Sequence, residues 1–196
     1  ALHSWFAHVP GLRVVMPSTV ADARDLLIAS VLCPDPVMYI DDRWLYEQED
    51  VLSPVVELNL IEQKPKISLS GNDITIVGSG HASLLAREGA NILRTENISA
   101  EVVDVRVLNP FFVDDIVESV KKTSNLLVVD SGCLSAGFSG EIIAKVLERL
   151  PVDCLQNPPM RIALPDASAP TSRFLERDYY LSSGNVVDAT KRILKI

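Results

Sequence analysis

The sequence predicts an α/β protein with a three-layer architecture, in which helices cover both faces of a mostly parallel sheet. The chain has 196 residues, of which 47% are hydrophobic and 22% are charged, so it contains enough apolar material for a packed core. After residue 73, short β-branched runs alternate with segments of helical periodicity. This alternation is typical of a parallel sheet, because each crossover between parallel strands needs a connection about as long as a helix.

The first 50 residues predict a single strand-helix-strand unit. A β-branched strand over 13–16 precedes Thr19, a residue type that caps helix N-termini, and apolar residues follow at helical spacing over 20–31. Prolines 34 and 36 stop this helix, and a second strand spans 37–40. A lone unit of this kind cannot bury both of its faces. We therefore expect it to need strands from preceding sequence or from another chain.

The pattern is lost between residues 41 and 72, where acidic residues and prolines gather. The predicted division is an incomplete domain over 1–50, a linker over 51–72 and an α/β domain over 73–196. Within that last domain, strands are expected near 74–77, 101–105, 126–129 and 160–163, and helices near 83–94, 114–122, 141–150 and 186–194.

Charge and cysteine usage exclude several classes of function. The net charge is −8 and no basic run exceeds Lys121–Lys122, so a nucleic-acid partner is not expected. The cysteines, at 33, 133 and 154, are too widely spaced for a zinc site or a disulfide framework, which favours a reducing compartment. No apolar run reaches the roughly 20 residues that span a bilayer, and the start lacks a signal pattern, so we expect no membrane association.

One glycine-containing turn approximates a dinucleotide-binding fingerprint. Gly78 and Gly80 follow a predicted strand and precede a helix, and Asp104 ends the next strand. Ser83 replaces the third glycine of the fingerprint. Such turns occur in any parallel α/β domain, so an ordinary turn is the favoured interpretation.

Three further polar segments have residue types that also favour turns or helix caps. Residues 130–132 and 165–166 follow strands, where α/β sheets place ligand sites, but their residue types also favour plain turns. Residues 137–140 resemble a nucleophile motif with the wrong spacing, and Ser139 is better interpreted as a helix N-cap. An autonomous hydrolase is therefore not expected.

An ordered series of segments resembles the beta subunits of the decarboxylating component of pyruvate and branched-chain 2-oxo acid dehydrogenases, which are transketolase-like proteins. The segments are 6–19, 35–37, 43–46, 73–77, 99–106, 119–123 and 137–142. The resemblance implies that residues 1–50 end a pyrimidine-binding α/β domain. It also implies that the transketolase carboxyl-terminal domain starts at about residue 66 and includes the whole of the predicted 73–196 domain.

The resemblance also implies a function for the complete protein, which is oxidative decarboxylation of a 2-oxo acid on thiamine diphosphate and magnesium, with acyl transfer to a lipoyl group. The family's activating glutamate and its His-Ser-Gln histidine would lie upstream, and Trp5 stands where that motif after His3 would need glutamine. We therefore expect no catalytic and no cofactor-binding residues in this chain. Its expected contribution is folding and subunit assembly, and the isolated chain is expected to be inactive.

A potassium site of the family would match Ser30, Val31, Cys33 and Asp35, although a thiol replaces an oxygen ligand at Cys33. The implied partners are an alpha subunit, a second beta subunit and a dihydrolipoyl acyltransferase core, in the cytoplasm or, in a eukaryote, the mitochondrial matrix. Two alternatives stay open. One is a thiamine enzyme of the transketolase or deoxyxylulose-phosphate synthase type, and the other is a noncatalytic dinucleotide-binding or interaction module.

Overall fold

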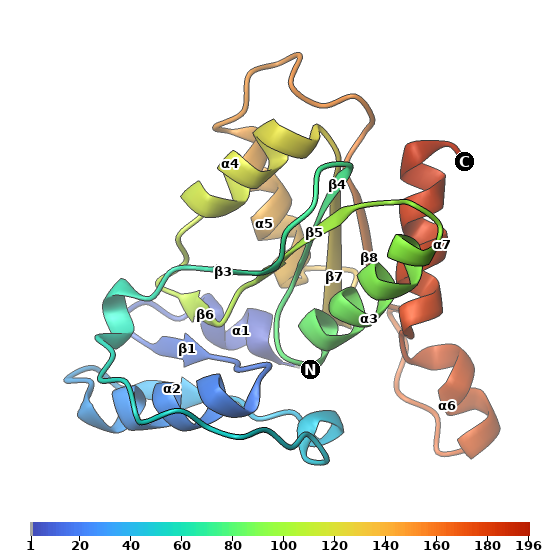
Figure 1. The fold of residues 1–196 in the computed structure, drawn as a ribbon. Coiled ribbons are helices and arrows are strands. Elements are labelled where there is room, and N and C mark those ends of the chain that lie inside the picture. The colour runs from blue at the N-terminus through green and yellow to red at the C-terminus, as the bar shows by residue number, and fades with distance from the viewer. Residues whose placement is uncertain (1) are drawn as a thin grey trace.

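The computed structural model describes residues 2–196 and contains two sheets (Figure 1). The larger sheet has five strands in the order β3-β5-β4-β7-β8. All neighbours are parallel except β3, which runs antiparallel to β5. The strands are β3 (Lys66–Leu69), β4 (Ile74–Gly78), β5 (Ala100–Asp104), β7 (Leu126–Cys133) and β8 (Met160–Leu164).

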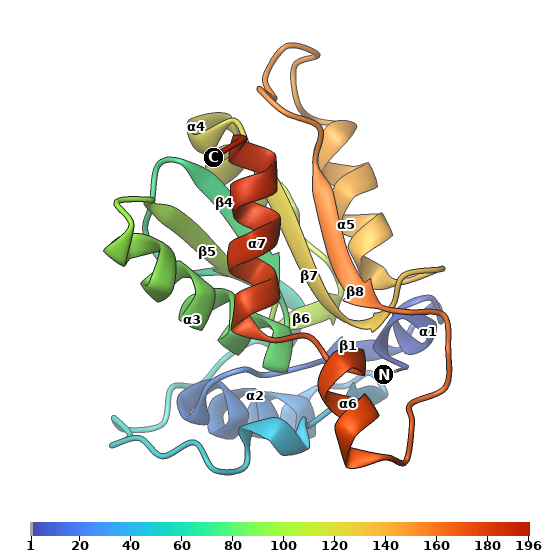
Figure 2. The ribbon, with the colours of Figure 1, turned by 90° about the vertical axis from the view of Figure 1, so that its right-hand side faces the viewer.

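Helices cover both faces of this sheet, which confirms the predicted three-layer α/β class. On one face, α3 (His81–Thr95) and α7 (Ser183–Leu194) enclose a core with the apolar side chains of β4 and β5 (Figure 2). On the other face, α4 (Asp114–Thr123) and α5 (Phe138–Leu147) enclose a second core. The predicted helices and strands of this region are all present, with ends that differ by a few residues.

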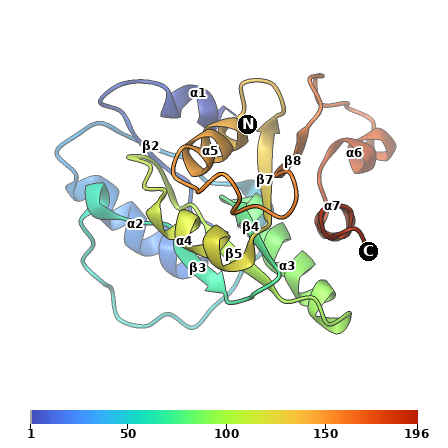
Figure 3. The ribbon, with the colours of Figure 1, turned by 90° about the horizontal axis from the view of Figure 1, so that it is seen from above.

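The N-terminal segment forms the expected strand-helix-strand unit from β1 (Arg13–Val15), α2 (Val20–Leu32) and β2 (Val37–Tyr39). Thr19 caps α2 as predicted, since its hydroxyl accepts a hydrogen bond from the Asp22 backbone N–H at 3.2 Å. An additional short helix, α1 (His3–Ala7), precedes β1 and lies near α5 (Figure 3).

A third strand of the small sheet comes from the same chain. Strand β6 (Val107–Asn109) pairs antiparallel with β1, while β2 pairs parallel with β1 on its other edge. We expected the additional strand to come from upstream sequence or from another chain, but the structure takes it from β6 of this chain. Three residues are too few to show a period-two pattern, so the strand was hidden in the turn after β5.

The segment expected to be a linker contains ordered elements. The 3₁₀ turn η2 (Leu60–Glu62) lies in it, a second 3₁₀ turn, η1 (Arg43–Leu45), lies just before it, and β3 joins the edge of the large sheet. The sequence did not reveal β3, because an edge strand with little buried surface needs no regular apolar alternation. The boundary at residue 73 therefore leaves out one strand of the sheet, whereas a start near residue 66 includes it.

Two features near the C-terminal half differ from expectation. Helix α5 begins at Phe138 with Gly137 as its N-cap residue, so Ser139 lies inside the helix and the predicted Ser139 cap is wrong. A short helix, α6 (Arg173–Tyr179), was not expected and presents exposed Phe174 and Leu175. None of the helices within residues 2–196 is both long and apolar enough to cross a membrane.

Candidate functional site

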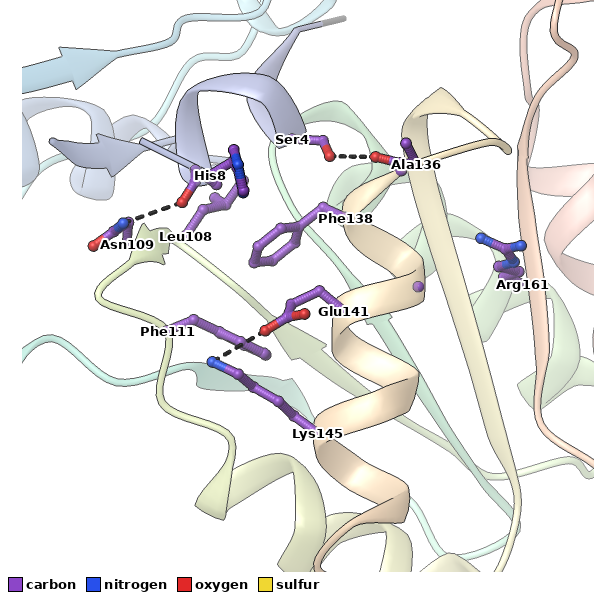
Figure 4. A pocket seen from close by; sticks show the side chains of 13 residues that line it. Ser4, His8, Leu108, Asn109, Phe111, Ala136, Phe138, Glu141, Lys145 and Arg161 are labelled. Atoms are coloured by element: carbon purple, nitrogen blue, oxygen red, sulfur yellow. Dashed lines mark hydrogen bonds and ion pairs between the residues drawn. The ribbon is translucent and has the colours of Figure 1, made fainter. Parts of the chain in front are cut away.

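A cavity of about 630 Å³ lies where the N-terminal segment meets the large domain, between α1, the chain after β6, and α5 (Figure 4). Its floor is aromatic, since the rings of Phe111 and Phe138 meet edge to face with centroids 5.2 Å apart. Lys145 lies over Phe111, with its Nζ 5.2 Å from the ring centroid, and also pairs with Glu141 at 3.3 Å. The cavity lining therefore combines aromatic rings with a few charged side chains.

Hydrogen bonds between the two halves of the chain hold the cavity walls in place. The Ser4 hydroxyl donates to the Ala136 carbonyl, and Asn109 Nδ2 donates to the Ala7 carbonyl at 3.1 Å (Figure 4). The residues around the cavity do not combine a nucleophile with an adjacent base. The arrangement can hold a side chain or a chain segment of a partner, and it offers no chemistry of a hydrolase.

A buried pair of hydrogen-bonded side chains lies beside this cavity and joins α1 to β7. His3 Nε2 lies 2.9 Å from Asp130 Oδ1, and the two side chains are 1% and 4% exposed. Asp130 also accepts hydrogen bonds of 2.8 Å from the backbone N–H groups of Gly132 and Ser139. Burial acts to raise the pKa of Asp130, but the hydrogen bonds and charge of His3 together with the two backbone donors outweigh it and lower the pKa to about 2.

The surroundings fix His3 in this position. A Cβ atom on Gly132 would lie 3.1 Å from His3 Cε1, so the glycine makes room for the imidazole ring. The sequence interpretation of residues 130–132 as a plain turn missed this pair. Residues 130–132 lie inside β7 and not in a turn after it, so the available signal was a carboxylate directly after the apolar residues 126–129. Nothing local pointed to His3, which lies 127 residues away.

A second buried cluster joins Pro17–Ser18 to the large domain. The Ser18 hydroxyl donates to Asp104 Oδ2, and Arg87 donates to the Ser18 hydroxyl at 3.0 Å and to its carbonyl at 3.2 Å. Burial raises the pKa of Asp104 to about 6, although Ser18 and Arg87 both act to lower it. Nearby, Arg106 pairs with Asp22 of α2 at 2.8 Å. These contacts make the junction polar as well as apolar.

The glycine turn after β4 is filled by the chain itself. Gly78 and Asp104 are register partners at the ends of β4 and β5, as a dinucleotide fingerprint would require. However, a Cβ atom on Gly80 would lie 2.7 Å from Met16 Cε, which shows how closely Met16 packs there. Met16 and Ser18 thus take the place that a bound pyrophosphate would need, and the dinucleotide-binding alternative is not favoured.

The other predicted turn residues behave as turn formers. Asp166 accepts hydrogen bonds from the Ser135 hydroxyl at 2.5 Å and from its backbone N–H at 3.1 Å. These hydrogen bonds lower the pKa of the exposed Asp166 carboxyl. Asp166 therefore ties two surface loops together.

The residues matched to a potassium site lie at the end of α2 and just before β2. Asp35 Oδ2 accepts hydrogen bonds from Arg13 Nε at 2.8 Å and Nη2 at 2.6 Å, so a cation already neutralises this carboxylate. The Ser30 carbonyl accepts the Cys33 N–H, and Val31 and Cys33 could offer only carbonyl oxygens and a thiol. Carbonyl oxygens are suitable potassium ligands, but the Asp35 carboxylate is already engaged by Arg13 and the Cys33 thiol is a soft donor. Across residues 2–196, no three His, Cys, Asp or Glu side chains cluster as a metal site.

Comparison with known proteins places these features in a family. Residues 63–186 match the family described as transketolase, C-terminal domain. The chain is 34% identical over 190 residues to the pyruvate dehydrogenase E1 component subunit beta of Rhizobium meliloti (strain 1021), covering 97% of this chain and 41% of the relative. It is 34% identical to the mitochondrial subunit of Saccharomyces cerevisiae and 36% identical to that of Caenorhabditis elegans, covering 98% of this chain and 53% and 56% of those relatives.

A solved structure shares the fold. The structure titled "Split gene transketolase, inactive beta4 tetramer" superposes with a TM-score of 0.76 and 24% identity, covering 98% of this chain and 60% of that chain. The chain spans about half the length of the relatives it matches. With its sheet order, its helical layers and its match over 63–186, the chain belongs to the transketolase C-terminal domain family.

Proposed function

We propose that this chain is part of the E1 beta subunit of a 2-oxo acid dehydrogenase complex, and that its own contribution is to fold and to assemble the subunits. The complete complex would decarboxylate a 2-oxo acid oxidatively on thiamine diphosphate and pass the acyl group to a lipoyl carrier. One observation carries the proposal, which is identity of about a third to pyruvate dehydrogenase E1 beta subunits across 97–98% of this chain.

The buried state of His3 supports a role in assembly. Its Nε2 atom is committed to Asp130 and its side chain is 1% exposed, so it does not face a substrate. In this proposal, thiamine diphosphate and magnesium are held by the complete complex and not by this chain alone. We therefore assign no catalytic step to this chain. Potassium at Ser30, Val31, Cys33 and Asp35 stays a prediction that the Arg13–Asp35 pair weakens.

Exposed apolar side chains support docking to other subunits. Leu27, Val31 and Leu32 are 48%, 78% and 65% exposed on α2, where they form an uncovered surface. The proposed partners are an alpha subunit, a second beta subunit and the dihydrolipoyl acyltransferase core. The proposed location follows the relatives, whose names include mitochondrial subunits, and is the mitochondrial matrix in a eukaryote or the cytoplasm in a bacterium.

Two measurements on the 196-residue chain test this proposal. With thiamine diphosphate, magnesium and pyruvate, the chain alone should not reduce an artificial electron acceptor. Sedimentation at micromolar concentration should show a dimer or a larger assembly. In the variant Val31→Asp, a charge on the α2 surface should shift the equilibrium toward monomer, because a buried unpaired charge opposes association.

The matched control is Val152→Asp, which places the same charge on a loop position that is 98% exposed and should not change assembly. Turnover by the chain alone that is lost in His3→Gln would overturn the noncatalytic role. A wild-type chain that is strictly monomeric and does not bind an E1 alpha subunit would overturn the assembly role.

A further inference from the structure

A second cavity, of about 180 Å³, opens at the carboxyl ends of β4 and β7. The connection after β4 leads through α3 to β5 on one side, whereas β7 lies on the other side and continues into α5 on the opposite face. The carboxyl ends of β4 and β7 therefore form the topological switch point of the sheet, where open α/β sheets bind their ligands. His81 and Ser131 reach the cavity from these two strand ends.

Aromatic side chains from distant parts of the chain wall the cavity. Trp44 of η1 stacks on His81 with ring centroids 5.6 Å apart and an interplanar angle of 17°. Tyr180, between α6 and α7, meets Trp44 edge to face at 5.9 Å. Three leucines complete the lining. The cavity is therefore assembled from the N-terminal segment, the large domain and the C-terminal connection, and it is not a gap within one element.

The charge in the cavity has one sign. Asp42 is its only acidic residue, and the lining contains no lysine or arginine. Burial lowers the pKa of His81, despite the opposing effect of Asp42 and Glu88, so the imidazole is neutral at pH 7. Asp42 Oδ1 accepts a hydrogen bond from the backbone N–H of Trp44 at 3.1 Å. Among residues 2–196, no partner engages its other oxygen.

We propose that this cavity binds a small organic ammonium ion, with its charge against Asp42 and the rings of Trp44 and Tyr180 and its alkyl groups against the leucines. Aromatic faces together with a carboxylate are the recurring chemistry of ammonium recognition. The volume equals about six waters at about 30 Å³ each, which is enough for a trimethylammonium group with a short substituent. This site is separate from the cavity beside α1 and does not depend on the proposed function.

Tryptophan fluorescence tests the proposal with choline chloride as the probe. The chain has two tryptophans, so Trp5→Phe leaves Trp44 as the only one and lies outside this cavity. In that background, choline should change the Trp44 emission saturably, while sodium chloride at equal ionic strength should not. Asp42→Asn keeps an amide oxygen that can cap η1, and it should weaken choline binding about fivefold through loss of the partly buried charge.

Two controls separate charge from shape. Asp188→Asn removes an exposed carboxylate on α7 and should leave the choline affinity unchanged. The neutral analogue 3,3-dimethylbutanol, which has the same shape without the charge, should bind more weakly than choline. Equal binding of the neutral analogue, or an Asp42→Asn variant with wild-type affinity, would overturn the ammonium assignment. Absence of saturation up to about 100 mM choline would overturn the site itself.

Discussion

Replacing Gly80 with alanine tests how the N-terminal segment is locked onto the large domain. Gly80 has a φ of +53° and a ψ of −130°, a backbone conformation that residues other than glycine rarely adopt. A Cβ atom added there would lie 2.7 Å from Met16 Cε and 3.0 Å from Met16 Cγ. Met16 is buried, so its side chain cannot move into solvent. The substitution therefore adds backbone strain and a steric conflict across the domain junction.

The expected loss of unfolding free energy is the sum of these two effects. Backbone strain at such a residue costs about 1–2 kcal/mol, and overpacking of a filled core typically costs about 1–3 kcal/mol. We expect Gly80→Ala to lose about 3 kcal/mol. Gly11 also has positive φ, at +80°, but an added Cβ there meets no atom within 4 Å, so Gly11→Ala should lose only about 1 kcal/mol.

Gly184 supplies a control with neither effect. Its Cβ would meet only Ser182 Oγ at 3.5 Å, so Gly184→Ala at the start of α7 should leave stability unchanged or slightly higher. Urea denaturation followed by circular dichroism measures all three variants. The Met16→Ala background isolates the steric part, since Gly80→Ala should then cost only its strain. A Gly80→Ala loss no larger than that of Gly11→Ala, or one unchanged by Met16→Ala, would refute the reasoning.

Three further predictions concern pH and chain mobility. The pKa of Asp104 in the folded chain, about 6, lies above its ordinary value of 3.8, so its stabilising contribution is complete below about pH 4 and is lost as pH rises through 6. Asp104→Asn should remove up to about 3 kcal/mol of the change in unfolding free energy between pH 4 and pH 7, as measured by urea denaturation at both values. The same change in variant and wild type would contradict this prediction. The pKa of Asp130 is lowered to about 2, so its contribution to the free energy of unfolding is complete above about pH 4 and is lost as pH falls through 2. Asp130→Asn should therefore remove about 2 kcal/mol of the stability that the wild type loses in acid. Acid titration followed by circular dichroism measures this difference. Limited proteolysis should cut first within 46–57, which is exposed and lacks regular structure, and early cleavage inside α3 would count against this.

The sequence predicted the large α/β domain well because its elements are long and patterned. The apolar runs at β4 and β7 are bounded by polar turns, and α3 and α4 each show one apolar face, so period and length agree. The cap at Thr19 was also predictable, since capping depends on residues only a few positions apart.

The elements that were missed are short or depend on distant partners. Strand β6 and helix α1 have three and five residues, too few for a period to appear. Strand β3 lies at the edge of the sheet and pairs only with β5, so its residues are little buried and show no regular apolar alternation.

The junction contacts were beyond local reasoning for a different reason. The sequence placed residues 78–80 and Asp104 together and favoured an ordinary turn over a dinucleotide site, but it did not show that Met16 packs against this turn and that Ser18 binds Asp104. A ligand pocket and a domain contact use the same turn chemistry, so residue types alone do not distinguish them. His3 similarly appeared in the sequence only as a rejected catalytic candidate, and its pairing with Asp130 depends on tertiary structure.

The pairing of β1 with β6 has a consequence for the order in which the chain folds. Val14 and Val15 meet their antiparallel partners only at Asn109 and Val107, so a ribosome must release more than ninety further residues before the small sheet can close. Contacts between such remote segments form slowly, because a long loop must be closed before any hydrogen bond compensates for the lost entropy. During synthesis, the apolar side of β1 therefore stays open while β3, β4 and β5 emerge, and that interval is when a chaperone or a partner subunit would have the greatest opportunity to bind it.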